Sequence, residues 1–254
     1  GCNPSHTPME PRLKLSRVSS TQPVDVTEYR SIMGMLRYLV HTRPDLAFSV
    51  GYVSRFMQEP TTEHMAAVKH VLRYVAGTLH WGVRYTRGDH DAPLIGYSDS
   101  DLGGDVDNRR SSTGVAFFLG SNLVSWQSQK QRVVALSSCE SEYMAATTAA
   151  CQGIWLARLL GEIKDEELKA AVLNVDNKSA ISLSKNPVYH DRSKHIEIRY
   201  HFIRECVENG KIQIEFVRSG DQLADVLTKA LGRVKLQEQR MKIGMVELDE
   251  AHKA

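Results

Sequence analysis

Hydrophobic residues recur at three- and four-residue intervals through the first third of the chain, which is the period of an amphipathic helix. We expect a first helix from about residue 25 to 42, with Asp25 or Thr27 as its N-cap. Proline turns then introduce a short helical segment at 45–56 and a third helix at 61–77. The residues before the first helix are rich in Pro, Ser and Thr without an apolar period, so we expect an extended lead-in.

Beyond residue 80 the pattern changes to short β-rich runs separated by Gly, Asn and Asp. Three such runs in a row predict an antiparallel meander, and a long helical pattern follows from about Ser138 to Ile163. Strands and helical stretches then alternate, which favours parallel pairing of those strands. The expected strands are 81–87, 94–101, 112–120, 122–128, 170–176 and 211–219, and the later helices are 177–186, 194–209 and 221–231. The fold class is therefore α/β, with a mixed sheet flanked by helices and preceded by a small helical region.

Length and composition exclude several classes of protein. The 254 residues suffice for one large domain or two modest ones. No apolar run approaches the roughly 18 residues of a membrane-spanning helix, and the N-terminal residues lack the apolar core of a secretory signal. We therefore expect a soluble, non-exported chain with no membrane partner. Because residue 1 is Gly, we also expect that it is not a natural translation start.

Neither the net charge nor the cysteine content identifies the function of the chain. With 32 basic and 30 acidic residues the net charge is +2, so any contact with nucleic acid must come from local basic patches. The four cysteines are scattered and form no CxxC pair. We expect reduced thiols, and neither a disulfide framework nor a zinc site.

Four acidic residues stand where strand and helix ends meet. Asp99 lies in the first strand of the meander, Glu142 in the first turns of the long helix, Asp176 at the end of the next strand and Asp225 in the last predicted helix. Such ends face one crevice in an open α/β sheet, so we expect a shared site. Mutual repulsion then requires hard divalent cations, and oxygen-only ligands favour Mg²⁺ or Mn²⁺ over zinc. Two such ions about 4 Å apart activate water and stabilise the leaving oxygen in phosphodiester hydrolysis.

Neighbouring carboxylates compete for these roles. Asp101 is either a second ligand on the first strand or, as we favour, a turn residue before two glycines. Glu140 completes a capping box with the serine three residues before it, whereas Glu142 shares a helix face with small alanines, which favours Glu142 as the ligand. Spacing alone does not decide between Asp221 and Asp225.

The second region contains four long, unusual segments: YSDSDLGGDVDNRRSSTGVAFFLG, LVSWQSQKQRVVALSSCESEYMA, VDNKSAISLSKNPVYHDRSKHIEIRYHFIRE and DQLADVLTKAL. They closely resemble the ribonuclease H domain of copia-type LTR retrotransposon Pol polyproteins. The earlier segment YRSIMGMLRYLVHTRPDLAFSVGYVSRFMQEPTTEHMAAVKHVLRYVAGT is similar to the end of the reverse transcriptase in the same polyproteins. The organisation that the resemblance implies is an extended lead-in (1–24), a helical remnant of the reverse-transcriptase thumb or connection (25–90), a ribonuclease H domain (91–232) and a partly helical C-terminal tail (233–254).

The resemblance implies a ribonuclease-H-like fold, with a five-stranded mixed sheet flanked by helices. It places the family's catalytic D-E-D-D set on Asp99, Glu142, Asp176 and Asp225, and so favours Asp225 over Asp221. The implied activity is endonucleolytic cleavage of the RNA strand of RNA–DNA hybrids, with two Mg²⁺ (or Mn²⁺) ions as cofactors. The implied partners are the hybrid and the reverse transcriptase domain of the same polyprotein, and the implied location is intracellular, in cytoplasmic virus-like particles or the nucleus.

Three basic stretches are candidate contacts to the nucleic-acid backbone, because phosphates are typically bound by such basic and hydroxyl side chains. Their basic residues are Arg109, Arg110, Lys130, Arg132, Arg192 and Lys194. The chain also departs from the family pattern. Many ribonucleases H carry a His in the loop before the last catalytic Asp, whereas RSGDQLAD has none, and we expect His201 to be packed or at the surface. The adjacent aspartates of a polymerase are missing, so we expect no DNA synthesis.

Two other functions are compatible with parts of the pattern. A catalytically silent, nucleic-acid-binding or domesticated fragment of Pol would keep the acidic set without turnover, and binding without cleavage would identify it. An integrase-type nuclease shares the fold class but has its Glu last in the acidic set. Here Glu comes second, which disfavours an integrase.

Overall fold

The computed structural model describes residues 3–88, 91–166, 169–185, 196 and 198–248. Contacts between Cα atoms divide the chain into two compact units. Unit 1 comprises residues 1–85, 105–108 and 229–254, and unit 2 comprises residues 86–104 and 109–228. In the described part of the chain, no helix has the length and apolar character needed to cross a membrane.

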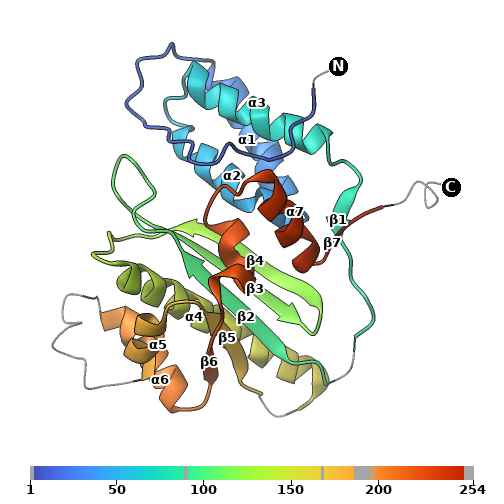
Figure 1. Ribbon diagram of the computed structural model, residues 1–254, viewed down its shortest axis with the longest axis vertical. Helices are drawn as coiled ribbons and strands as arrows, with labels where there is room; N and C mark the ends of the chain where they lie inside the picture. Colours follow the sequence, from blue (N-terminus) through green and yellow to red (C-terminus); the bar gives the residue numbers. More distant parts are fainter. Residues whose placement is uncertain (1–2, 89–90, 167–168, 186–195, 197, 249–254) are drawn as a thin grey trace. The chain divides into compact units, whose positions relative to one another are not determined.

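Unit 1 joins the N-terminal helices to the C-terminal end of the described chain. Asp25 caps its first helix by accepting hydrogen bonds from the backbone N–H groups of Thr27 and Glu28. Its two strands pair antiparallel. The strand expected at 81–87 is shorter than predicted, since it spans Trp81–Val83, and its partner, Met245–Glu247, lies far along the chain. The elements of unit 1 are α1 (Val26–Leu39), η1 (Pro44–Leu46), α2 (Ala47–Val53), η2 (Ser54–Phe56), α3 (Thr62–Ala76), β1 (Trp81–Val83), α7 (Arg233–Lys242) and β7 (Met245–Glu247) (Figure 1).

A buried polar network holds α7 in unit 1. Asp45 pairs with Arg43 at 2.7 Å and accepts a hydrogen bond of 2.6 Å from the Tyr74 hydroxyl. Arg240 of α7 donates to the same hydroxyl at 3.0 Å, and its guanidinium lies 4.0 Å from the ring centroid of Trp81. These contacts hold the buried Arg240 against Tyr74 and Trp81, so the C-terminal segment is an integral part of this unit.

Unit 2 is a five-stranded mixed sheet in the order β4-β3-β2-β5-β6. The consecutive strands β2, β3 and β4 pair antiparallel, while β5 pairs parallel with β2 and β6 pairs parallel with β5. The meander, the parallel pairing and the five-stranded mixed sheet expected from the sequence are all confirmed. The strands are β2 (Leu94–Ser100), β3 (Ser112–Leu119), β4 (Asn122–Lys130), β5 (Ala171–Val175) and β6 (Ile212–Phe216).

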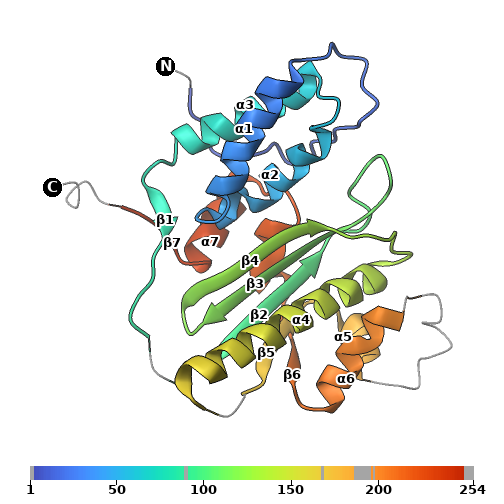
Figure 2. The same cartoon turned by 180° about the vertical axis from the view of Figure 1, so that it is seen from behind.

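Three helices, α4 (Ser138–Lys164), α5 (Lys178–Lys185) and α6 (Phe202–Glu208), pack together over one face of this sheet (Figure 2). The long helix approaches closely because small residues face the strands. A Cβ on Gly153 would lie 3.0 Å from the Phe117 ring, and a Cβ on Gly96 would lie 2.5 Å from it. Glycine at both positions therefore lets Phe117 fill the space between helix and sheet. A 3₁₀ turn, η4 (Ile198–His201), leads into α6.

The segment 221–231 differs from the α-helix predicted for it. It forms the 3₁₀ turns η5 (Ser219–Asp221) and η6 (Leu223–Leu227). A Cβ on Gly114 of β3 would lie 2.8 Å from the carbonyl oxygen of Ala224, so this turn is pressed directly against the sheet. Packing at Gly114 and anchoring at both ends of η6 therefore outweigh the local preference for an α-helix.

Candidate active site at the carboxyl edge of the sheet

The strands β2, β4, β5 and β6 run in the same direction, so their carboxyl ends share one edge of the sheet. Asp99 lies near the end of β2, Asp176 directly follows β5, and Glu142 lies in the second turn of α4. One ligand oxygen of each of these three residues lies within 4.8 Å of the others. Elements that are distant in sequence thus bring three of the four predicted carboxylates together.

A hydrogen bond from the protein orients each carboxylate of this cluster. The backbone N–H of Ser100 donates to Glu142 Oε1 at 3.0 Å, and the hydroxyl of Ser219 donates to Asp176 Oδ2 at 2.9 Å. The hydroxyl of Thr228 donates to Asp99 Oδ2. Such supporting contacts fix the rotamers of metal-binding side chains.

The electrostatics of the cluster favour a bound cation. Asp99 and Glu142 are only 3% and 5% exposed. Burial, followed by repulsion from Asp99 and then Asp176, raises the pKa of Glu142 to about 9. Glu142 Oε2 is also buried without a hydrogen-bond donor among the described residues. Three converging carboxylates, one of which has a buried oxygen without a donor, fit a hard divalent cation such as Mg²⁺ or Mn²⁺.

Asp225 lies beside this cluster and is not a member of it. Among the described residues, the acidic side chains whose ligand oxygens lie within 4.8 Å of one another are those of Asp99, Glu142 and Asp176. Asp225 is 1% exposed in η6, three residues before the threonine that contacts Asp99. Gln222 holds the start of η6 by donating to the carbonyl oxygen of Ser98 in β2 at 2.9 Å. The fourth predicted carboxylate is therefore anchored next to β2, outside the closest group.

The competing carboxylates have other roles. Asp101 accepts a hydrogen bond from the backbone N–H of Ser112, as expected for a residue that shapes the loop after β2. Glu140 accepts from the backbone N–H of Leu136 at 2.7 Å, one residue before the Ser137 cap, so it serves the helix start in a variant of the predicted box. Asp221 is exposed in η5.

The predicted basic contacts lie in different places. Lys130 and Arg132 line an open cavity of about 340 Å³ that also includes Thr113, Thr147 and Tyr200. This cavity adjoins the acidic cluster, because its Thr113 lies opposite Ser100 in the β2–β3 register and the N–H of Ser100 donates to Glu142. Arg109 and Arg110 lie between β2 and β3, and Arg109 adopts a left-handed backbone conformation (φ 57°). Arg192 and Lys194, like His195, fall outside the described residues.

His201 is packed as expected, since its Nδ1 lies 3.0 Å from the Tyr143 hydroxyl.

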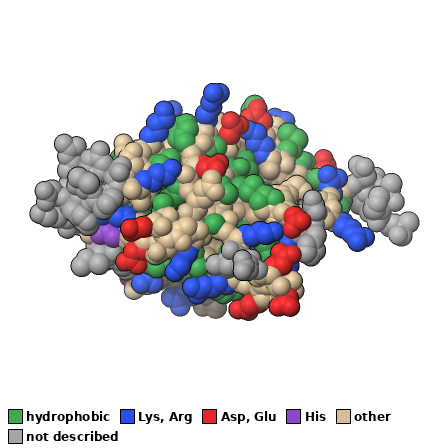
Figure 3. Space-filling view, turned by 90° about the horizontal axis from the view of Figure 1, so that it is seen from below, with side chains coloured by type: hydrophobic (Ala, Val, Ile, Leu, Met, Phe, Trp, Pro, Cys, Tyr) green, Lys and Arg blue, Asp and Glu red, His purple; other side chains and the backbone are tan. Residues whose placement is uncertain are grey.

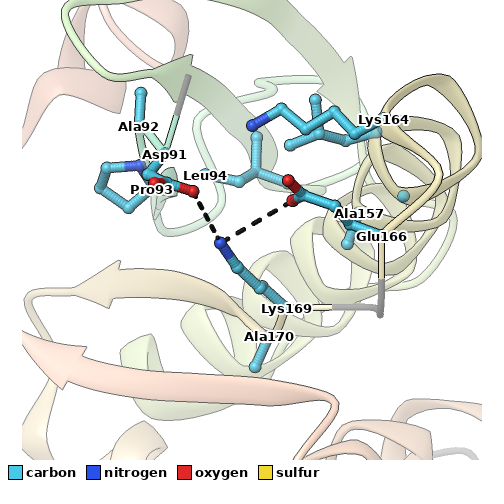
Figure 4. A pocket seen from close by; sticks show the side chains of 11 residues that line it. Asp91, Ala92, Pro93, Leu94, Ala157, Lys164, Glu166, Lys169 and Ala170 are labelled. Carbon is cyan, nitrogen blue, oxygen red and sulfur yellow. Dashed lines mark hydrogen bonds and ion pairs between the residues drawn. The ribbon is translucent and has the colours of Figure 1, made fainter. Parts of the chain in front are cut away.

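Two other cavities of unit 2 lack the chemistry of a nuclease site. One, of about 220 Å³, lies at the opposite edge of the sheet, where Lys169 pairs with Asp91 at 3.1 Å and with Glu166 at 3.8 Å (Figure 4). These are exposed ion pairs of small energetic value. The other, of about 360 Å³, is an apolar groove between α4 and the strands that includes the exposed Trp155 and Ile163 and has no ionisable side chain. Exposed apolar side chains also appear among charged ones on the face in Figure 3.

The sequence analysis missed the residues that orient the acidic cluster. Thr228, Ser219 and Gln222 are ordinary polar residues in or beside short 3₁₀ turns, and their partners are 43 to 129 residues away. The signal in the sequence was the presence of single polar residues within an otherwise apolar stretch, Gln222-Leu-Ala-Asp-Val-Leu-Thr228. In the structure these polar residues are buried, and buried polar groups usually have a specific hydrogen-bond partner.

Thr228→Val tests this orienting role. Removing the hydroxyl that holds Asp99 should raise the Mg²⁺ concentration needed for half-maximal activity about tenfold, the usual size of such supporting contacts. A metal titration of hybrid cleavage measures this. Thr42→Val is the matched control, because the Thr42 hydroxyl lies in unit 1 and donates to the carbonyl oxygen of Leu39. Equal metal requirements in the two variants would contradict the assignment.

Comparisons with known proteins identify relatives of similar sequence and a solved structure of similar fold. The chain is 43% identical over 245 residues to the retrovirus-related Pol polyprotein from transposon RE1 of Arabidopsis thaliana, covering 96% of this chain and 17% of that protein. It is 43% identical over 249 residues to the corresponding polyprotein from transposon TNT 1-94 of Nicotiana tabacum, covering 95% of this chain and 18% of that protein. The chain thus spans less than a fifth of the length of these curated relatives.

Among solved structures, the foamy viral protease–reverse transcriptase in complex with an RNA/DNA hybrid is similar in fold, with a TM-score of 0.52 at 13% identity. That similarity covers 80% of this chain and 26% of the viral one. No protein-family model matches the chain. On the strength of the sequence identity across nearly all of its residues, the chain belongs to the family of copia-type, retrovirus-related Pol polyproteins of transposons.

Proposed function

We propose that this chain is a ribonuclease H that hydrolyses the RNA strand of RNA–DNA hybrids with the help of divalent metal ions. The observation that carries the proposal is the convergence of Asp99, Glu142 and Asp176 within 4.8 Å at the carboxyl edge of the sheet. Two further findings support it: the family of the chain, and the hybrid bound by the viral enzyme of similar fold.

In this proposal, some residues bind the metal ions and others position the carboxylates. Asp99, Glu142 and Asp176 would hold Mg²⁺ or Mn²⁺, with Asp225 beside them. The chemistry that such ions supply is the activation of water and the stabilisation of negative charge at the phosphate. Ser100, Ser219 and Thr228 keep the carboxylates in place by the hydrogen bonds described above.

Substrate binding would use the surfaces beside the cluster. Lys130 and Arg132, which line the adjoining cavity, would contact backbone phosphates, which position a nucleic acid without reading its sequence. Selection of RNA would depend on the shape of the hybrid and on its 2′-hydroxyl groups. The helical unit 1 would add contacts to the hybrid, and the reverse transcriptase of the same polyprotein would be the partner that produces this substrate.

A cleavage assay tests the proposal. We expect the purified chain to cut the RNA strand of an RNA–DNA hybrid with Mg²⁺ or Mn²⁺, leaving 3′-hydroxyl and 5′-phosphate ends, and to be inactive with EDTA. Double-stranded RNA and double-stranded DNA of the same sequence are the control substrates. A folded chain that binds the hybrid and cuts it with neither metal would contradict the proposal and identify a silent, nucleic-acid-binding fragment of Pol.

A further inference from the structure

A lysine and an aromatic ring meet on the β6 side of the acidic cluster. Lys178 is the first residue of α5, two residues after Asp176, and its ammonium lies 5.0 Å from the ring centroid of Phe216. Phe216 is the last residue of β6 and lies opposite Val175 in register. The pair therefore stands next to the strand that ends in Asp176.

The exposure of Phe216 is unusual for its position. Ile212, Ile214 and Phe216 alternate along β6 and so point to the same face of the sheet. The two isoleucines are 2% and 3% exposed beneath the helices, whereas Phe216 is 48% exposed. The ring thus extends beyond the core at the edge where the carboxylates lie, and its contact there is with a cation.

Lys178 is also not explained by the stability of its helix. The N-terminus of a helix carries a partial positive charge, which disfavours a lysine in the first turn. Helical side chains lean toward the N-terminus, so from this first position Lys178 extends toward the carboxyl edge. The side chain is exposed, and no carboxylate among the described residues lies within ion-pair distance of its ammonium. Its charge is available to a ligand at the acidic cluster.

The geometry points to a second phosphate contact, on the opposite side of the cluster from Lys130. Lys130 ends β4, two strands from β2, and Phe216 ends β6, next to β5. We propose that Lys178 binds a backbone phosphate of the substrate and that Phe216 positions its ammonium. This inference rests on the proposed function, because it gives the same site a nucleic-acid substrate held on both sides of the carboxylates.

Steady-state cleavage of a defined RNA–DNA hybrid at saturating Mg²⁺, over a range of KCl concentrations, tests the pair. Lys178→Gln should raise KM about fivefold with kcat nearly unchanged, and should lower the slope of log KM against log salt by about one, the signature of one lost phosphate contact. Lys178→Arg should restore both values. Phe216→Leu, which keeps apolar bulk but removes the ring, should raise KM about threefold.

The matched control is Lys185→Gln, an exposed lysine at the far end of the same helix, which should behave as the wild type. Binding of the hybrid without divalent metal, measured on the same variants, separates the outcomes. If the wild type cleaves the hybrid and Lys178→Gln keeps the wild-type KM and salt slope, the inferred contact between Lys178 and a phosphate is excluded, while the proposed function stands. A Lys178→Gln variant that changes only the Mg²⁺ requirement would likewise overturn it. A wild-type chain that neither binds nor cleaves hybrid would overturn both.

Discussion

Asp176→Asn should abolish cleavage of the hybrid, lowering kcat by at least about a thousandfold, which corresponds to about 4 kcal/mol of transition-state stabilisation. Asp176 supplies one of the three oxygens that converge within 4.8 Å, and an amide is a weaker, neutral ligand for a hard cation. Single-turnover cleavage of a labelled hybrid in Mg²⁺ measures the loss. The substitution relieves repulsion between Asp176 and the two buried carboxylates, so the metal-free variant should unfold at a temperature no lower than the wild type.

Two variants bracket this result. Asp221→Asn removes an exposed carboxylate of η5 outside the cluster and should cleave as the wild type does. Asp225→Asn removes the carboxylate beside the cluster and should lower kcat less than Asp176→Asn, about tenfold to a hundredfold, because Asp225 is not among the three residues that converge. A fully active Asp176→Asn enzyme would exclude the acidic cluster as the site of chemistry.

The sheet and the positions of three carboxylates could be predicted from the chain because they depend on local patterns. Alternating apolar runs define β2, β3 and β4, and the long helix before β5 favours a strand that runs parallel to β4 and therefore to β2. That order alone places Asp99 and Asp176 at one edge. The capping serine of α4 likewise assigns Glu140 to the helix start and leaves Glu142 for the site.

The contacts that complete the site depend on partners that no local pattern reveals. Thr228 and Asp99 are 129 residues apart, and the choice of a 3₁₀ turn for η6 follows from Gly114, in another strand. The Lys178–Phe216 pair joins the start of a helix to the end of a strand that lies more than thirty residues later. Such pairs require the register of the strands, which periodicity does not supply.

Glu142→Gln should remove a pH dependence of stability from the metal-free protein. The pKa of Glu142 is raised from its ordinary value of 4.5 to about 9 in the folded chain, so between these values the folded state holds a proton that the unfolded state releases. The free energy of unfolding of the wild type should therefore fall as pH rises through this window. Relative to Glu142→Gln, whose amide does not titrate, the loss at alkaline pH should be about 3 kcal/mol, because one pKa unit corresponds to about 1.4 kcal/mol and relaxation of the site reduces the full effect.

Chemical denaturation of both proteins in EDTA, at several pH values across the window, measures the difference. The comparison between the two proteins cancels groups that titrate equally in both, such as the surface carboxylates. Millimolar Mg²⁺ should then restore stability to the wild type at alkaline pH by binding the ionised cluster, and should stabilise Glu142→Gln less, because the variant lacks one charged ligand. Parallel pH profiles for the two proteins in EDTA, together with equal stabilisation by Mg²⁺, would show that Glu142 neither holds the extra proton nor binds the cation.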